Sequence, residues 1–258
     1  MIWETIAVAF GMFSAVPVPQ PVWGEKNMRY ALCAFPLVGI VCGLSWWAWA
    51  AVCGRLALPE VLRGAGFCLL PVLVTGGVHL DGFADVSDAL ASHAPPEKKR
   101  EILQDSRCGA FAIIRLCGYF IAYWALCCAL RPTAEALWKT GASFVLSRAL
   151  SGLAIVSLPL AKNTGLAHTF AAGANQKRAR VILTLTAMAG ASALCWGGRI
   201  PAIGMFLAVM IVFWNYARTA QKEFGGISGD LAGWFLVRAE LWMLAALVLC
   251  QYGEGLFT

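Results

Sequence analysis

The chain has 258 residues, of which 60% are hydrophobic and only 13% are charged, and its formal net charge is +6. Soluble domains carry about 25% charged and about 45–50% apolar residues, so this composition excludes an ordinary soluble domain and makes the lipid bilayer the main solvent. Because the basic residues lie between apolar segments and form no stripe, the charge does not indicate a nucleic-acid partner.

The apolar segments predict an all-α, polytopic integral membrane helical bundle in a single domain of residues 1–258. A helix needs about 20 apolar residues to cross a bilayer. The N-terminal segment, residues 1–30, holds a shorter apolar stretch, Ile2–Val16, and we expect an interfacial or re-entrant helix there. About seven transmembrane helices follow: Ala31–Cys53, Val61–His79, Gly109–Leu130, Ala136–Leu160, Arg180–Gly197, Ile200–Ala217 and Leu231–Cys250.

Lysine and arginine are concentrated on one side of the membrane when these spans alternate in direction. That side includes the segment before Ala31, and a positive bias marks the cytoplasm, so we predict it to be cytoplasmic. The five aspartates of the chain fall on the same side: Asp81, Asp85, Asp88, Asp105 and Asp230. Carboxylates near hydrocarbon are costly unless they are paired or metal-bound, which predicts a cytoplasmic site centred on an acidic loop or helix at residues 80–108.

Three of these aspartates form a helical pattern. Asp81, Asp85 and Asp88 are spaced i, i+4, i+7, so on a helix their carboxylates share one face. They repel one another unless a cation neutralises them, and oxygen ligands favour Mg²⁺, with Mn²⁺ as an alternative. Gly82 leaves room for a ligand, and His79 is a candidate hydrogen-bond partner of an aspartate or a phosphate. The alternative is a solvated acidic helix face, although the small and aromatic neighbours make a poor solubilising surface.

A second polar cluster, Asp105-Ser106-Arg107, precedes the third predicted span. Asp105 is a further candidate metal ligand, and Ser106 with the amides that follow it is a candidate phosphate site at a helix start. Arg107 offers a bidentate fork for phosphate. A helix cap at Asp105 or Ser106 with a snorkelling Arg107 explains the same residues equally well.

Two further charged residues stand out. Arg148 falls in the middle of a predicted span, where a charge costs at least a few kcal/mol. We interpret it as a phosphate-binding side chain in a cavity that reaches into the membrane; the alternative is a structural pair with an aspartate or with Glu240. Asp230 follows a glycine-rich segment and either caps the last helix or reaches the metal site.

The acidic motifs, in this order and spacing, resemble those of the cobalamin-5′-phosphate synthase family, also called adenosylcobinamide-GDP ribazoletransferases. They are His79-Leu80-Asp81-Gly82-x-Ala84-Asp85-x-x-Asp88, Asp105-Ser106-Arg107-x-Gly109 and Gly225-Gly226-x-Ser228-Gly229-Asp230. The resemblance runs from about residue 10 to 235, nearly the whole chain. The chain departs from the usual family pattern in four ways: Ala89 replaces Gly, Ala110 and Ser228 each replace Thr, and the Arg often found before the early Pro-x-Pro, here Pro17-Val18-Pro19, is missing.

The resemblance implies a Mg²⁺-dependent phosphotransferase in the cytoplasmic membrane of a bacterium. The ribose 3′-hydroxyl of α-ribazole, or of its 5′-phosphate, attacks the cobinamide-linked phosphorus of adenosylcobinamide-GDP; GMP leaves and adenosylcobalamin, or its 5′-phosphate, forms. The implied roles are metal binding for Asp81, Asp85, Asp88 and Asp105, phosphate binding for Arg107 and Arg148, and metal binding or orientation of the hydroxyl for Asp230. A homo-oligomer and a complex with other corrinoid enzymes are both left open.

Two other classes of protein remain as alternatives. A CDP-alcohol phosphatidyltransferase also clusters aspartates around metal, but its motif expects Arg where Asp85 follows Ala84. An ion-coupled transporter, the non-enzymatic alternative, places acidic groups near the bilayer midplane and is built from related halves. Here the aspartates fall at one membrane face and the sequence shows no internal repeat.

Overall fold

The computed structural model describes residues 2–20, 24–105, 107–161 and 165–254. The helices in these residues are α1 Ile2–Phe13, α2 Glu25–Met28, α3 Ala31–Leu56, α4 Glu60–Thr75, α5 Val78–Ala91, α6 Pro96–Ile102, α7 Ala110–Ala129, α8 Ala134–Ser157, α9 Leu166–Gly173, α10 Gln176–Leu194, α11 Arg199–Thr219, the π-helix η1 Ala220–Phe224 and α12 Gly229–Glu254. The described residues form no sheet, so the predicted all-α class is confirmed.

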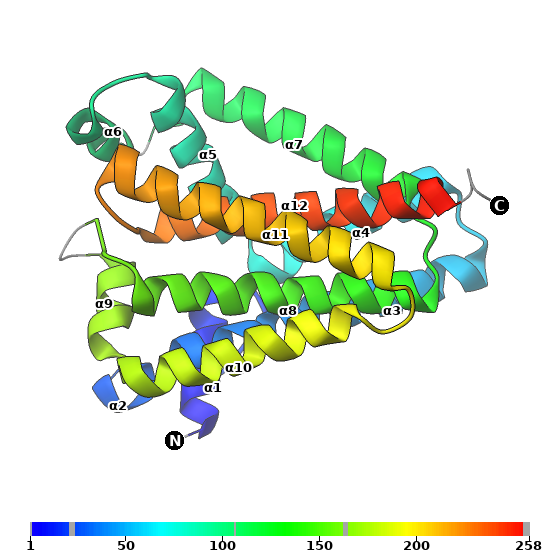
Figure 1. The fold of residues 1–258 in the computed structure, drawn as a ribbon, viewed down its shortest axis with the longest axis horizontal. Coiled ribbons are helices and arrows are strands. Elements are labelled where there is room, and N and C mark those ends of the chain that lie inside the picture. The colour runs from blue at the N-terminus through cyan, green and yellow to red at the C-terminus, as the bar shows by residue number, and fades with distance from the viewer. Residues whose placement is uncertain (1, 21–23, 106, 162–164, 255–258) are drawn as a thin grey trace.

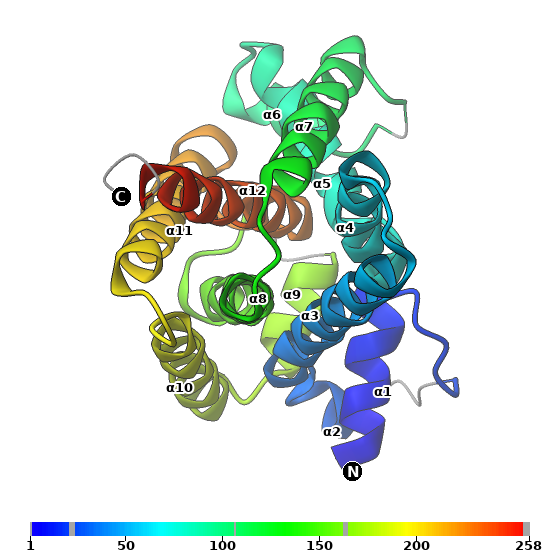
Figure 2. The ribbon, with the colours of Figure 1, turned by 90° about the vertical axis from the view of Figure 1, so that its right-hand side faces the viewer.

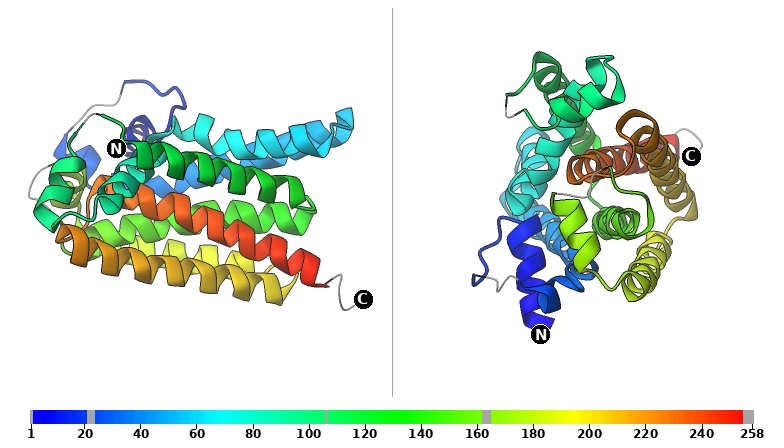
Figure 3. Two further views of the ribbon diagram at one scale, coloured as in Figure 1. Left: turned by 90° about the horizontal axis from the view of Figure 1, so that it is seen from above. Right: turned by 90° about the vertical axis from the view of Figure 1, so that its left-hand side faces the viewer.

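The long helices lie side by side along the horizontal axis of Figure 1. One end of the bundle carries α2, α5, α6, α9 and the start of α12, and we call it the α6 end (Figure 3, right). The opposite end carries the α3–α4, α7–α8 and α10–α11 connections (Figure 1). Successive long helices therefore alternate in direction, as expected of a chain that crosses a bilayer repeatedly.

Helix α8 occupies the middle of the bundle, as the end-on view in Figure 2 shows. It is the most buried of the five helices that are long and apolar enough to span a membrane. Glycines let α3 approach it closely: a Cβ at Gly39 would lie 2.5 Å from the carbonyl oxygen of Phe144. Small residues at such contacts are the usual means by which membrane helices pack closely.

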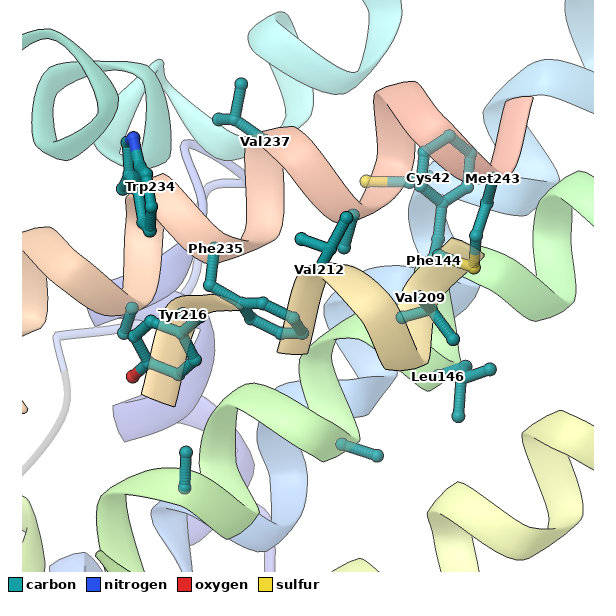
Figure 4. Packing of buried hydrophobic residues seen from close by; sticks show 14 of the residues in the cluster. Cys42, Phe144, Leu146, Val209, Val212, Tyr216, Trp234, Phe235, Val237 and Met243 are labelled. Carbon is teal, nitrogen blue, oxygen red and sulfur yellow. The ribbon is translucent and has the colours of Figure 1, made fainter. Parts of the chain in front are cut away.

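A second part of the core joins α11 to α12 (Figure 4). The rings of Tyr216 and Phe235 are stacked with centroids 5.0 Å apart. Val209 and Val212 of α11 are also buried in this core, as is Met243 of α12. This packing holds the first turn of α12, which carries Asp230, at the α6 end.

Five of the predicted spans are confirmed as long apolar helices: α3, α7, α8, α11 and α12. The shorter N-terminal helix is also present as α1, which has 12 residues. The predicted span Arg180–Gly197 corresponds to α10, which packs beside α8. Because α10 begins with Lys177, Arg178 and Arg180, it is less apolar than the five, and the total of seven spans is not confirmed.

The predicted span Val61–His79 ends earlier than expected. Helix α4 stops at Thr75, and α5 leaves it at an angle of 95°. The bend is made by Gly76 and Gly77, whose φ angles are +65° and +78°, a region that glycine enters without steric cost. The acidic motif therefore lies on a helix that runs across the end of the bundle rather than along it (Figure 1).

Candidate active site

The acidic motif reaches the start of α12 through a close crossing of α5 and α12. A Cβ at Gly82 would lie 2.7 Å from the carbonyl oxygen of Asp230, and a Cβ at Gly233 would lie 3.0 Å from that of His79. Glycine at both positions removes the side chains that would keep the two backbones apart. The space beside Gly82 is thus filled by Asp230, and this glycine brings Asp81 and Asp230 into one site.

The carboxyl group of Asp85 is affected by the negative charges of the neighbouring aspartates. Helix α5 turns away from α4 by 95° and is not one of the five helices that are long and apolar enough to span a membrane. Partial burial, and after it the negative charges of Asp81, Asp230 and Asp88, together raise the pKa of Asp85 from 3.8 to about 6. The four carboxylates are therefore close enough to repel one another, as the spacing of the first three predicted.

Asp88 sits at the N-terminus of α7. A Cβ at Gly109 would collide with its carboxylate, so only glycine lets the acid occupy this place. The backbone N–H of Ala112 donates a hydrogen bond to Asp88 Oδ1 at 3.4 Å. The positive end of the α7 dipole also stabilises a negative charge here. Asp88 thus ties α5 to α7 while remaining next to the other acids.

The donor chemistry of this cluster suits a hard divalent cation, because all four side chains offer carboxylate oxygens. The carboxylates are, however, too far apart to form a complete metal site. Within the described part of the chain, no three Asp, Glu, His or Cys side chains converge closely enough to hold a metal ion. The cluster therefore fits Mg²⁺ or Mn²⁺ in chemistry, and its side chains would have to move closer together to hold such an ion.

The second predicted motif forms a local pair. Arg107 donates hydrogen bonds through Nε and Nη2 to the carboxylate of Asp105, the latter at 2.7 Å, and these bonds lower the pKa of Asp105 to about 2. Both side chains are exposed. Ser106 lies outside the described residues. The structure therefore places Asp105 with Arg107, and its role as a metal ligand stays a prediction.

The glycine-rich segment is fixed to the end of α8. The N–H of Ile227 donates to the carbonyl of Pro159 at 2.8 Å, and the N–H of Ala161 donates to that of Ile227 at 2.9 Å. Gly226 has φ +152°, and a Cβ there would lie 2.5 Å from the backbone of Leu160. These contacts leave no room for a side chain at Gly226.

The cap of α12 is Ser228, whose Oγ accepts a hydrogen bond from the N–H of Leu231 at 3.2 Å. Asp230 lies in the first turn that follows. The role of Asp230 at the metal site stays a prediction.

Two basic residues of α6 hold the segment that precedes the glycine-rich loop. Lys99 pairs with Glu223, and Arg100 Nη1 donates a hydrogen bond to the carbonyl of Phe224 at 3.2 Å. Arg100 also contacts Gly225. The basic run Lys98-Lys99-Arg100 is visible in the sequence, but its partners Glu223 and Phe224 lie about 120 positions away and carry no local signal.

Arg148 is 1% exposed and pairs with Glu240 at 2.7 Å, which is one of the alternatives left open by the sequence. Ser147 also donates a hydrogen bond to the Glu240 carboxylate, at 3.2 Å. Arg148 Nη1 donates to the carbonyl of Phe144 at 2.9 Å as well. The described structure thus gives this guanidinium an internal carboxylate partner, and its contact with phosphate stays a prediction.

Together, these features define a multi-pass membrane protein with an acidic site at one end of its helical bundle. The chain belongs to the cobalamin-5-phosphate synthase family, whose sequence profile matches residues 5–248. The resemblance of the acidic motifs is thereby confirmed. Family membership makes the chain an enzyme, a transferase of cobalamin biosynthesis that acts on a corrinoid.

Curated relatives agree over almost their full length. The chain is 36% identical to an adenosylcobinamide-GDP ribazoletransferase of Lachnoclostridium phytofermentans, with 98% of this chain and 97% of the relative covered. It is 29% identical to the enzyme of the same name from Clostridium perfringens, with 92% and 94% covered. A transporter is therefore set aside, as is a CDP-alcohol phosphatidyltransferase. No solved structure matches the chain.

Proposed function

We propose that the chain transfers the adenosylcobinamide phosphate of adenosylcobinamide-GDP to α-ribazole or α-ribazole 5′-phosphate. The 3′-hydroxyl oxygen of the ribose forms a bond to the cobinamide-linked phosphorus. The bond from that phosphorus to the oxygen bridging to GMP breaks, GMP leaves, and the hydroxyl proton is released. The product is adenosylcobalamin or its 5′-phosphate. The names of the relatives support this choice of substrates.

The observation that carries the proposal is the meeting of Asp81, Asp85, Asp88 and Asp230 at the crossing of α5 and α12, seen in the raised pKa of Asp85. Mutually repelling carboxylates at one helix crossing are poor for stability and suit a cation shared with a diphosphate. We assign Asp81, Asp85 and Asp88 to Mg²⁺, or to Mn²⁺, with Asp105 in support. Bound there, the ion would neutralise charge on the diphosphate.

Other residues position the substrates. Asp230 accepts a hydrogen bond from the ribose hydroxyl and so orients it toward phosphorus. The exposed guanidinium of Arg107 exchanges Asp105 for a phosphate, whose oxygens it binds bidentately. Negative charge that builds up on the departing GMP is thereby stabilised, which is the main task of a site for phosphoryl transfer.

The lysine and arginine bias supports placing the α6 end on the cytoplasmic side of a bacterial inner membrane. Adenosylcobinamide-GDP carries a charged diphosphate and would reach the site from that compartment. The lipid bilayer is then the permanent partner of the long helices, whose exposed side chains include Leu44, Ile121 and Leu207.

The test measures GMP release by the detergent-purified full chain, given adenosylcobinamide-GDP, α-ribazole and Mg²⁺. Asp81→Asn keeps the size of the side chain and removes its charge, so we expect at least a hundredfold loss of rate, the scale typical of a key electrostatic group. EDTA should abolish release, and added Mn²⁺ should restore part of it.

Glu60→Gln is the matched control. Glu60 is an exposed acid at the opposite end of the bundle, where it forms a 3.6 Å pair with Arg63. Its activity should stay within about twofold of the wild type, since exposed pairs contribute little. A folded Asp81→Asn protein with wild-type activity would contradict the metal assignment. Failure of the wild type to release GMP with either ion would contradict the reaction.

A further inference from the structure

A cavity of about 180 Å³ opens beside the carboxylates, among α1, α3, α5, α8, α9 and α12. Asp81 and Asp230 lie in its wall, so it is continuous with the candidate active site. Three phenylalanines form much of the rest: the rings of Phe13 and Phe35 are 4.3 Å apart, and those of Phe13 and Phe170 are 5.4 Å apart. The wall of the cavity therefore combines an aromatic cluster with two carboxylates.

Two polar atoms in this wall lack partners. His79 Nε2 and Ser151 Oγ are both buried, and neither has a hydrogen-bond partner among the described residues. Ser151 is 1% exposed, and the His79 ring lies 5.6 Å from that of Phe35. A buried polar atom without a partner costs free energy, so the pair indicates a ligand that supplies the missing hydrogen bond.

The lining excludes the charged parts of the substrates. It contains no Lys or Arg and has two aspartates, so a phosphate would be repelled. The nearby guanidinium of Arg148 is paired with Glu240. The volume equals that of about six water molecules, which suits a bicyclic ring and is far too small for a corrin. A lipid chain would leave both polar atoms without partners. Of the parts of the two substrates, the one that fits this cavity is the neutral aromatic base of α-ribazole.

We propose that this cavity binds the benzimidazole base of α-ribazole, an inference that rests on the proposed function. The base stacks among Phe13, Phe35 and Phe170. Its single ring nitrogen free of ribose accepts a hydrogen bond from Ser151 Oγ or His79 Nε2. The attached ribose then lies toward Asp81 and Asp230, which places its hydroxyl at the carboxylates. Ser151 and His79 are thus specificity-determining residues for the acceptor.

The test uses binding without turnover. Equilibrium dialysis with the detergent-purified full chain, in the absence of adenosylcobinamide-GDP, compares α-ribazole with α-ribosylindole, in which a C–H replaces the free ring nitrogen. We expect the wild type to bind α-ribosylindole about tenfold more weakly, as for the loss of one buried hydrogen bond. One of the two variants, Ser151→Ala or His79→Phe, removes the group that donates the hydrogen bond to the ring nitrogen. That variant should bind the two ligands equally.

Ser157→Ala is the control, because Ser157 lies on the same helix α8, is exposed and is not part of the cavity wall. It should keep the tenfold preference. In turnover, the variant that loses the preference should also raise the KM for α-ribazole about tenfold while changing the KM for adenosylcobinamide-GDP by less than twofold. A merely structural role would disturb both constants together.

The proposal is overturned if the wild type binds the two ligands equally, or if folded Ser151→Ala and His79→Phe both keep the preference. These results are separable from the fate of the proposed reaction. GMP release with unchanged KM values in both variants removes the cavity assignment and leaves the reaction. The expected binding pattern without any GMP release keeps the base site and removes the reaction.

Discussion

Gly82 of α5 touches the backbone of Asp230 at the start of α12: a Cβ at residue 82 would lie 2.7 Å from the Asp230 carbonyl oxygen and 2.8 Å from its Cα. This contact places the neighbouring Asp81 beside Asp230, although 149 positions separate the two along the chain. The site is therefore assembled by a helix crossing that only glycine permits, in addition to the spacing of aspartates on one helix.

Adding a methyl group at this crossing should separate the two halves of the site. We expect Gly82→Ala to destabilise the protein by about 1–3 kcal/mol, the usual cost of overpacking. GMP release should fall at least tenfold, because a displacement of about 1 Å near reacting groups is costly. Thermal unfolding in detergent and the rate of GMP release measure the two effects.

Gly118→Ala supplies the control for this substitution. Gly118 lies in α7 with nothing within 4 Å of a Cβ at that position. Alanine favours a helix over glycine, so this variant should be as stable as the wild type or slightly more stable, with full activity. If Gly82→Ala behaves like Gly118→Ala, the crossing tolerates separation and does not set the geometry of the site.

The sequence predicted the parts of this arrangement that depend on local rules. The thickness of a bilayer sets the length of an apolar run, so α3, α7, α8, α11 and α12 were found close to their true limits. The spacing of Asp81, Asp85 and Asp88 depends only on helical periodicity, and the three acids do lie close together.

What the sequence could not predict depends on contacts between distant segments. Apolar residues continue through Gly76 and Gly77, so hydropathy alone gave no sign of the 95° bend. The place of Asp88 at the start of α7 requires the absent side chain of Gly109. Likewise, Ser151 looks like any other small residue of a span in the sequence, because its place in a cavity wall depends on the packing of α5 and α9 beside α8.

The buried pair of Arg148 and Glu240 should be sensitive to the loss of one partner. Glu240→Ala leaves a guanidinium without its carboxylate in an apolar interior, and we expect a loss of about 3–5 kcal/mol in the free energy of unfolding. The double variant Arg148→Met/Glu240→Leu removes both charges and should recover most of this loss. Denaturant unfolding in detergent gives the three values.

The same double variant tests whether Arg148 contacts substrate. The guanidinium of Arg148 is already paired with Glu240, so we expect it to make no contact with the substrate. The KM of the double variant for adenosylcobinamide-GDP should therefore stay within about threefold of the wild type, because the loss of a substrate contact would raise this KM. A folded double variant with a tenfold higher KM would show instead that Arg148 binds a phosphate of the substrate.

Arg107 should affect substrate binding without affecting stability. Its pair with Asp105 is exposed, so Arg107→Ala should leave Tm unchanged. If the guanidinium binds the diphosphate, the KM for adenosylcobinamide-GDP should rise at least tenfold. Arg107→Lys should recover only part of the affinity, because an ammonium cannot form the bidentate contact. Equal KM values for all three proteins would remove Arg107 from the site.

Asp85 should make metal binding depend on pH. In the metal-free protein, burial and the neighbouring carboxylates raise its pKa from 3.8 to about 6. A proton therefore competes with the ion below pH 6, and metal affinity should fall by up to tenfold for each further unit of acidification. Above about pH 7 the carboxyl is ionised and the affinity should be constant.

The stability of the metal-free protein should show the opposite trend. A folded-state pKa above the unfolded value means that the folded state binds the proton more tightly, so the contribution of Asp85 to stability increases as pH falls from about 7 to about 4. The pH dependence of metal affinity is measured by titrating the protein with Mn²⁺ between pH 5 and 7.5 and following the electron paramagnetic resonance signal of the free ion. Asp85→Asn should bind the ion more weakly and lose the pH dependence near 6. A wild-type affinity that is constant across this range would show that Asp85 is not a ligand.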